Sequence, residues 1–280
     1  MDPSALILLF LFTLVVGGFV GGTGIGGVLL VPYLVFVLGM EAQNAVASAM
    51  FAYIFSGVAA TFAYARHGSI KWSMVWAICG AAVPAALLGS VTLWSVPGEM
   101  LLAGLAALTI FSGYRTLRPP KDCRSDNEDI RAPTLMMVGG LSGFVSALVG
   151  AGGAVVVIPL MFAMGAPALL AIGLSHAIQF VIAVTATIGN LSVGQIDFTT
   201  GGVIAVALVI GIMIGTRVAH SLHVDTLRKT VAWVLTLVGL SIVTRNTLLA
   251  PTSNRDHRLR GSGGAGAMDP LALGSHIAFT

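Results

Sequence analysis

Apolar residues follow one another along this chain in long runs, and the charged positions fall between the runs. No Asp, Glu, Lys or Arg occurs in residues 3–40, 42–65, 72–98, 100–114, 132–196, 198–216 or 230–244. A helix needs about 20 apolar residues to cross a bilayer. The runs therefore predict an all-α, polytopic membrane protein.

The runs divide into ten hydrophobic segments, five in each half of the chain. They are 4–21, 27–39, 43–65, 73–94 and 99–117 in the first half, and 133–149, 154–165, 168–191, 199–219 and 227–247 in the second. The second segment of each half has only about 13 residues, which is short for a crossing. We expect these two segments to be short re-entrant or broken helices, each following a glycine-rich cluster.

The two halves repeat one another at an offset of 126 positions (150 minus 24). Gly24-Ile25-Gly26-Gly27 recurs as Gly150-Ala151-Gly152-Gly153, and each cluster leads through an apolar run to a proline, Pro32 or Pro159. The loop sequence at 68–72 likewise matches the one at 194–198. We therefore divide the chain into a first repeat (1–118), a cytoplasmic linker (119–131), a second repeat (132–250) and a flexible C-terminal tail (251–280).

Basic residues indicate how the halves are oriented. Loop 66–72 contains Arg66 and Lys71, whereas the equivalent loop 192–198 contains no Lys or Arg. Lys and Arg accumulate on the cytoplasmic side of a membrane protein. The reversed bias, together with an odd number of crossings in each half, predicts two inverted-topology repeats.

Composition excludes a water-soluble enzyme and narrows the substrate. Charged residues make up 9% of the chain and hydrophobic residues make up 56%. So few charged residues could not cover the surface of a soluble protein of this size. The net charge of +3 reports membrane orientation and not nucleic-acid binding. All eleven acidic residues lie at segment ends, in the linker or in the tails, which favours an anionic or neutral substrate over a cation. Two cysteines define no disulfide or metal framework, and we expect no cofactor.

The glycine clusters are the first candidate binding elements. Glycine allows a helix to break at membrane depth, and the next helix start offers amide groups that favour an anion. The candidate residues are Gly24, Gly26, Gly27, Gly150, Gly152 and Gly153. The alternative is that small residues simply let helices pack closely.

Polar side chains inside the third segment of each half complete the candidate site. They are Asn44 and Ser48 in the first half and Ser175, His176 and Gln179 in the second. Such groups are costly in a membrane and line pathways or helix interfaces. The two serines could instead bond to their own helix, and His176 could form a structural interhelical hydrogen bond.

One enzyme motif also occurs. Gly140-Leu141-Ser142-Gly143 matches the Gly-x-Ser-Gly of intramembrane serine proteases, and His176 could act as its base. The motif lies outside the duplicated cluster, so we rank a protease as a remote alternative and expect no catalytic residues.

The duplicated Gly-x-Gly-Gly–Pro pattern, the serine-bearing third segments and the Gly-x-Ile loops resemble the sulfite exporter TauE/SafE family, also called the toluene sulfonate uptake permease family. The resemblance covers about residues 1–248. It implies a multi-pass carrier of the bacterial inner membrane for sulfite, sulfoacetate or other organosulfonates. The resemblance decides neither between import and export nor between a monomer and a homodimer. A passive anion channel is the main alternative. The expected partners are a small anion and the lipid bilayer, with no nucleic acid.

Overall fold

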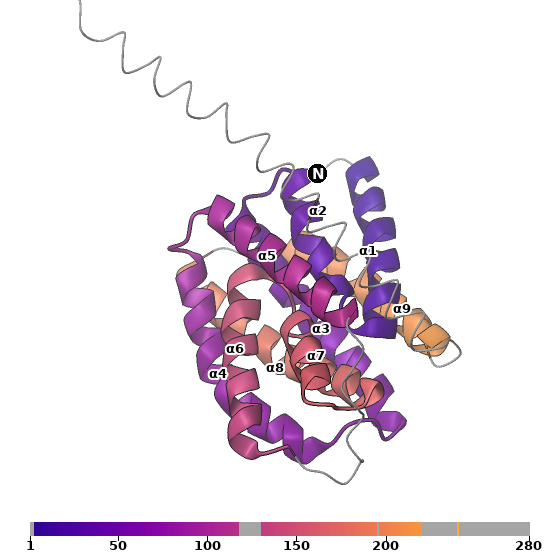
Figure 1. The fold of residues 1–280 in the computed structure, drawn as a ribbon. Helices are drawn as coiled ribbons and strands as arrows, with labels where there is room; N and C mark the ends of the chain where they lie inside the picture. Colours follow the sequence, from indigo (N-terminus) through magenta and orange to yellow (C-terminus); the bar gives the residue numbers. More distant parts are fainter. Residues whose placement is uncertain (1–2, 118–129, 195, 220–239, 241–280) are drawn as a thin grey trace, which may run out of the picture. The chain divides into compact units, whose positions relative to one another are not determined.

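The structure is a computed structural model that describes residues 3–117, 130–194, 196–219 and 240. Over these ranges the chain forms helices joined by short turns, and no strand is present (Figure 1). The first half contains α1 (Pro3–Thr23), the 3-10 turn η1 (Gly26–Leu29), α2 (Leu30–Phe36), α3 (Ala42–Arg66), α4 (Trp72–Leu93) and α5 (Gly98–Leu117). The second half contains α6 (Ala132–Val149), α7 (Ala154–Ala163), α8 (Ala168–Val193) and α9 (Phe198–Ala219).

These helices confirm the prediction of an all-α, polytopic membrane protein. Among the described residues, six helices are long and apolar enough to cross a membrane: α1, α3, α4, α6, α8 and α9. The short second segments are present as η1 with α2 and as α7, and neither has the length of a crossing. Most of the predicted linker, the segment 227–247 except for residue 240, and the tail 251–280 lie outside the described residues.

The outer faces of the helices carry large apolar side chains. Trp76 on α4 is 73% exposed and Met137 on α6 is 76% exposed. Charged residues lie at helix ends, as Lys71 before α4 and Arg217 in the last turn of α9 illustrate. A surface of this kind suits hydrocarbon and not water.

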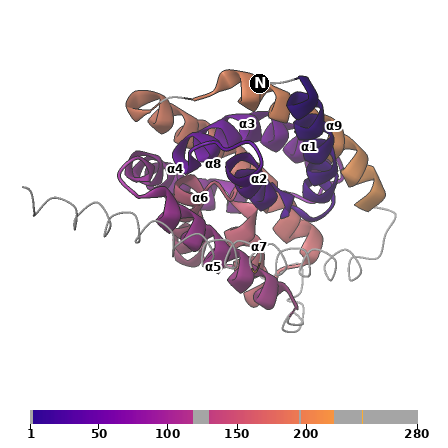
Figure 2. The same ribbon diagram turned by 90° about the horizontal axis from the view of Figure 1, so that it is seen from above.

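Helix packing follows the sequence repeat. At an offset of 126 positions α6 is equivalent to α1, and α9 is equivalent to α4. In the structure α1 packs along α9 and α6 packs along α4, as both ribbon views show (Figures 1 and 2). These two extensive contacts are therefore equivalent, because exchanging the halves converts one into the other.

Glycines at both contacts repeat the relation residue by residue. A Cβ atom on Gly17 of α1 would lie 2.9 Å from the Leu208 carbonyl oxygen of α9. One on Gly143 of α6 would lie 2.5 Å from the Ala82 carbonyl oxygen of α4. Both residues of the second contact are offset by 126 from those of the first. The absent side chains let the helix backbones touch, as small residues do in membrane helix pairs.

Helices α3 and α8 form the interior of the bundle. They are the most buried candidate spans, at 61% and 67% against 50% or less for the others. Gly57 packs against the Phe180 backbone, and Gly173 packs against the Ser69 carbonyl, so α3 and α8 run antiparallel. Equivalent helices in opposite directions are what an inverted repeat requires. The sidedness of the loops stays a prediction.

Candidate substrate site at the two glycine segments

The first glycine segment (residues 24–27) and the second (residues 150–153) begin in the same way. The Gly24 amide donates to the Val20 carbonyl at 2.7 Å, and the Gly150 amide donates to the Ser146 carbonyl at 3.0 Å. Both glycines have positive φ, 78° and 72°. This left-handed turn ends α1 and α6 and redirects the chain into the interior, which explains the glycine at each position.

Beyond this shared turn the two segments differ. The first continues through η1 into α2, whereas the second holds positive φ at Gly152 and Gly153 as well and leads directly into α7. At α7 the Ala154 amide donates to the Gly152 carbonyl, and the Val156 amide donates to the Gly153 carbonyl. The first segment also uses two amides, because the Ile25 amide donates to the Thr23 hydroxyl at 3.3 Å and the Leu30 amide donates to the Gly27 carbonyl. Both segments thus use amide groups that we expected to be free for an anion.

The first segment packs against both halves of the protein. A Cβ atom on Gly24 would lie 2.8 Å from Ile158 Cδ1 and 3.1 Å from the Ser175 hydroxyl oxygen on α8. From α3, the Tyr53 hydroxyl donates to the Gly27 carbonyl at 2.5 Å. The segment is therefore closely packed and fixed at its end by a buried tyrosine.

A second tyrosine of α3 bonds just before this segment. The Tyr64 hydroxyl donates to the Gly21 carbonyl at 2.9 Å, in the last turn of α1. Carbonyl groups in the last turn of a helix lack an intrahelical partner, and the hydroxyl supplies one. Two tyrosines from α3 thus bond to the backbone on either side of Gly24.

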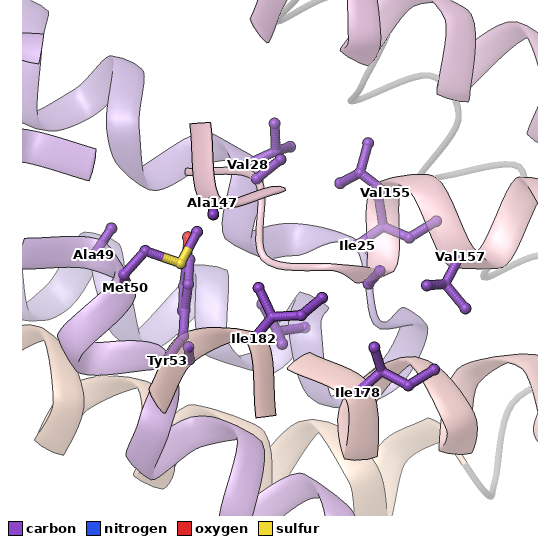
Figure 3. Packing of buried hydrophobic residues seen from close by; sticks show 14 of the residues in the cluster. Ile25, Val28, Ala49, Met50, Tyr53, Ala147, Val155, Val157, Ile178 and Ile182 are labelled. Atoms are coloured by element: carbon purple, nitrogen blue, oxygen red, sulfur yellow. The ribbon is translucent and has the colours of Figure 1, made fainter. Parts of the chain in front are cut away.

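The second segment also packs against both halves. A Cβ atom on Gly150 would lie 2.7 Å from Val31 Cγ2, and one on Gly152 would lie 3.2 Å from the Tyr53 ring. Tyr53 therefore bonds to the first segment through its hydroxyl and packs against the second through its ring. Figure 3 shows this interior, with Ile25 and Val28 from the first segment, Val155 and Val157 from α7, Ala49, Met50 and Tyr53 from α3, and Ile178 and Ile182 from α8.

The two predicted serines are buried but are used differently. The Ser175 hydroxyl donates to the Ile172 carbonyl of its own helix at 2.7 Å, which is the local bond considered above as the alternative. The Ser48 hydroxyl has no partner, although Ser48 is 0% exposed. Its carbonyl oxygen lies 3.2 Å from the position of a Cβ atom on Gly201 of α9. The Ser48 backbone therefore lies at the α3–α9 contact, and its hydroxyl is buried without a partner.

Gln179 reaches the centre of the bundle, whereas Asn44 does not. The Gln179 amide donates to the Ser56 hydroxyl of α3 at 3.3 Å, and its Cδ atom lies 3.6 Å from the position of a Cβ atom on Gly152. Asn44 lies in the first turn of α3, where its amide donates to Glu41 at 3.4 Å. The structure thus brings Gln179 to the second glycine segment and leaves Asn44 near the helix end.

His176 of α8 is completely buried, and its side chain faces α3. Its ring lies beside that of Tyr64, with centroids 5.3 Å apart. The Val20 backbone is close to the ring, but neither ring nitrogen has the geometry of a hydrogen bond. The interhelical hydrogen bond that we considered for His176 is therefore not formed.

The protease motif does not assemble in this structure. Ser142 is buried on α6, and its hydroxyl donates to the Gly139 carbonyl at 3.1 Å. Because His176 makes no hydrogen bond, it does not activate Ser142 here. Nucleophilic catalysis requires the two groups within hydrogen-bond reach.

Sequence reasoning missed Tyr53, Tyr64 and Ser56. The offset of 126 that identified the clusters also aligns Tyr53 with Gln179 and Tyr64 with Asn190. Asn190 is buried, and its side-chain amide oxygen accepts a hydrogen bond from the Trp94 indole at 3.3 Å. Polar residues at equivalent positions of two apolar helices could therefore have identified Tyr53 and Tyr64 from the sequence.

Long apolar spans, two short interior helices and buried polar groups around two glycine segments define a polytopic membrane transporter. Comparison with known proteins agrees and gives the family. The profile of the family described as "Sulfite exporter TauE/SafE" matches residues 6–242, so the chain belongs to that family.

Two curated relatives have similar length. The chain is 23% identical over 256 residues to the "Probable membrane transporter protein YjnA" of Bacillus subtilis, covering 85% of this chain and 99% of the relative. It is also 23% identical over 262 residues to the "Probable membrane transporter protein MJ0441" of Methanocaldococcus jannaschii, covering 83% and 95%. No solved structure matches the chain.

Proposed function

We propose that this protein is a secondary carrier of small sulfur-containing anions, such as sulfite, sulfoacetate or other organosulfonates. We further propose that it works in the inner membrane of a bacterium. The family name supports sulfite as a member of the substrate class. The proposal covers both import and export, and a flux measurement determines which of the two occurs.

The observation that carries the proposal is the chemistry of the buried surfaces. In the described residues, none of the buried side chains is Asp, Glu, Lys or Arg, while hydroxyl, amide and imidazole groups are buried beside the glycine segments. Cation carriers place carboxylates within their spans. Neutral donors and backbone amides are the groups that hold an anion without an opposing fixed charge.

Close packing at the segments supports a carrier over a passive channel. Gly24 and Gly150 each lie where a methyl group would overlap a side chain of the opposite half. An anion would reach this backbone only when the halves move relative to one another, as alternating access demands. A channel would instead keep a continuous path open.

A binding panel followed by a flux assay tests the proposal. Purified protein is melted with sulfite, sulfate, thiosulfate, taurine, sulfoacetate and an aryl sulfonate, because a ligand of the folded state raises its apparent stability. The stabilising anion is then tested for counterflow in proteoliposomes loaded with the same anion. Counterflow identifies a carrier, saturable binding without counterflow favours a channel, and failure of every sulfur anion to bind contradicts the substrate class.

A further inference from the structure

His176 is the one Asp, Glu, Lys, Arg or His side chain that is buried in the described part of the chain, at 0% exposure. Neither of its ring nitrogens has a hydrogen-bond partner. Buried polar atoms without partners are uncommon, since such an atom gives up its bonds to water without replacement. An unpartnered imidazole at this depth is therefore expected to gain its partner in another state of the protein.

Few titratable groups surround this imidazole. On the helices packed around it, α3 carries Tyr53 and Tyr64, α4 carries Cys79, and the charged or titratable groups at the helix ends are Glu41, Arg66, His67, Lys71, Asp197 and Arg217. The two carboxylates in this set, Glu41 and Asp197, are exposed at the starts of α3 and α9. Helices α1, α6 and α7 carry no Asp, Glu, Lys, Arg, His, Cys or Tyr. The Tyr64 ring is the aromatic group that faces His176. Among the described residues no carboxylate is buried with His176 to balance its protonated form.

The position of His176 links it to the first glycine segment. Ser175 precedes it, and the Ser175 hydroxyl oxygen lies 3.1 Å from the position of a Cβ atom on Gly24. The Tyr64 ring and the Val20 backbone both lie beside the imidazole. Val20 belongs to the last turn of α1, immediately before that segment, and the Tyr64 hydroxyl donates to the Gly21 carbonyl in the same turn. An anion at the first glycine segment would therefore lie beside the imidazole.

An isolated charge in such surroundings is expensive, so the imidazole is neutral while the site is empty. A nearby anion favours the protonated form. We propose that His176 takes up one proton when an anion binds at the first glycine segment, so that anion and proton are carried together. The inference rests on the proposed function, because it requires an anionic substrate.

Charge balance explains why this coupling is useful. A monovalent sulfonate and one proton together carry no net charge. The pair therefore enters an apolar interior at a smaller cost than the anion alone. The proton resides on a ring nitrogen of His176, and a protonated imidazole has a donor on each ring nitrogen, so it can donate to a sulfonate oxygen.

Proton uptake by the unaltered protein is the direct test. Methanesulfonate is the probe, because it stays ionised over the whole range and cannot supply the proton itself. Binding is measured by calorimetry in buffers of different ionisation enthalpy, which gives the number of protons taken up. We expect uptake approaching one proton per anion and a Kd that rises by up to about tenfold per pH unit between about pH 6 and 8.

Two matched variants assign the proton. His176→Gln keeps a polar side chain of similar size but cannot be protonated, so its Kd should change by less than about twofold over the same range. His67→Gln removes the exposed histidine at the end of α3 and should keep the parent's dependence. Melting curves establish that both variants fold.

Each outcome separates the inference from the function it rests on. Methanesulfonate binding without proton uptake by the parent overturns the proton proposal and leaves the anion carrier standing. A His176→Gln variant that retains the pH dependence also overturns it. If the parent binds no sulfonate and no sulfite at any pH, the proposed function itself fails. If His176→Gln does not fold, proton uptake by the parent still decides the question.

Discussion

The two glycine segments start from the same turn but are held in place by different means. Hydroxyl groups of Tyr53 and Tyr64 bond to the backbone at Gly27 and Gly21, on either side of the first turn. The equivalent positions of α8 are Gln179 and Asn190, and these bond to Ser56 and Trp94 instead. The second segment relies on three positive-φ glycines and on apolar contacts.

The difference shows where chemistry can be asymmetric within a symmetric scaffold. Backbone turns and glycine contacts between helices recur at the offset of 126, because close packing tolerates little variation. Side chains around the segments have diverged, and the buried histidine of the described residues, His176, lies on the side of the first segment. The equivalent of His176 is Ala49 at the offset of 127 that pairs Ser48 with Ser175, and Met50 at the offset of 126 that pairs Tyr53 with Gln179; neither can be protonated. We therefore expect the first segment to set the response to pH and the second to serve mainly in packing and movement.

The largest expected effect comes from filling the shared turn. Gly24→Ala and Gly150→Ala should each reduce transport by about tenfold or more, since both place a Cβ atom at positive φ and against a side chain under 3 Å away. Initial uptake rates in proteoliposomes measure the loss. Gly80→Ala is the control, because nothing lies within 4 Å of a Cβ atom there. Normal uptake by both segment variants would refute the claim that the turns are essential.

Sidedness is the next comparison, between loop 66–72 and loop 192–198. We expect His67→Cys to be labelled from the cytoplasmic side and Thr199→Cys from the opposite side, in a background lacking Cys79 and Cys123. Both parent side chains are exposed. A membrane-impermeant maleimide applied to intact cells and to inverted vesicles gives the result. Labelling of both positions from one side would rule out inverted repeats.

A moderate effect is expected when the tyrosine bonds are removed. Tyr53→Phe and Tyr64→Phe each delete one buried donor to the backbone around the first segment, which should lower stability by about 1–3 kcal/mol and slow transport several-fold. Apparent melting temperature and uptake rate are the measurements. Tyr114→Phe, at a 54% exposed tyrosine of α5, should change both only slightly. An unchanged melting temperature in both interior variants would mean that the hydroxyls do not fasten this segment.

How far the sequence could be interpreted depends on the kind of feature. Hydrophobic runs predicted the described helices closely, because a bilayer allows few alternatives to a continuous helix. The duplicated glycines also predicted the positions of both interior turns, because these turns need the positive φ that glycine allows. Tyr53 and Tyr64 were not predicted, since a tyrosine in an apolar run gives no sign of which distant carbonyl its hydroxyl will meet. Nor could spacing along α3 reveal that Asn44 stays at the helix end while Ser56 meets Gln179.

The smallest effect concerns the helix starts at the ends of the two compared loops. Asp197 accepts hydrogen bonds from the amides of Thr199 and Thr200, at 3.0 and 3.1 Å, and from the Thr200 hydroxyl at 2.6 Å. It therefore caps α9, whereas its equivalent Lys71 provides no side-chain cap for α4. Asp197→Ala should lower stability by about 1 kcal/mol near neutral pH, and Lys71→Ala should have a smaller effect.

Acid should remove this difference between Asp197→Ala and the parent. Burial raises the pKa of Asp197, but the hydrogen bonds from Thr200 and Thr199 lower it by more than burial raises it. The pKa of Asp197 therefore lies below its ordinary value of 3.8. A carboxyl with a lowered folded-state pKa stabilises the folded protein above its unfolded pKa, and the contribution is lost as pH falls through the folded value. The melting temperatures should therefore differ by a constant amount from about pH 5 to 8 and converge below about pH 4. A gap that persists in acid would show that Asp197 acts through packing and not through its charge.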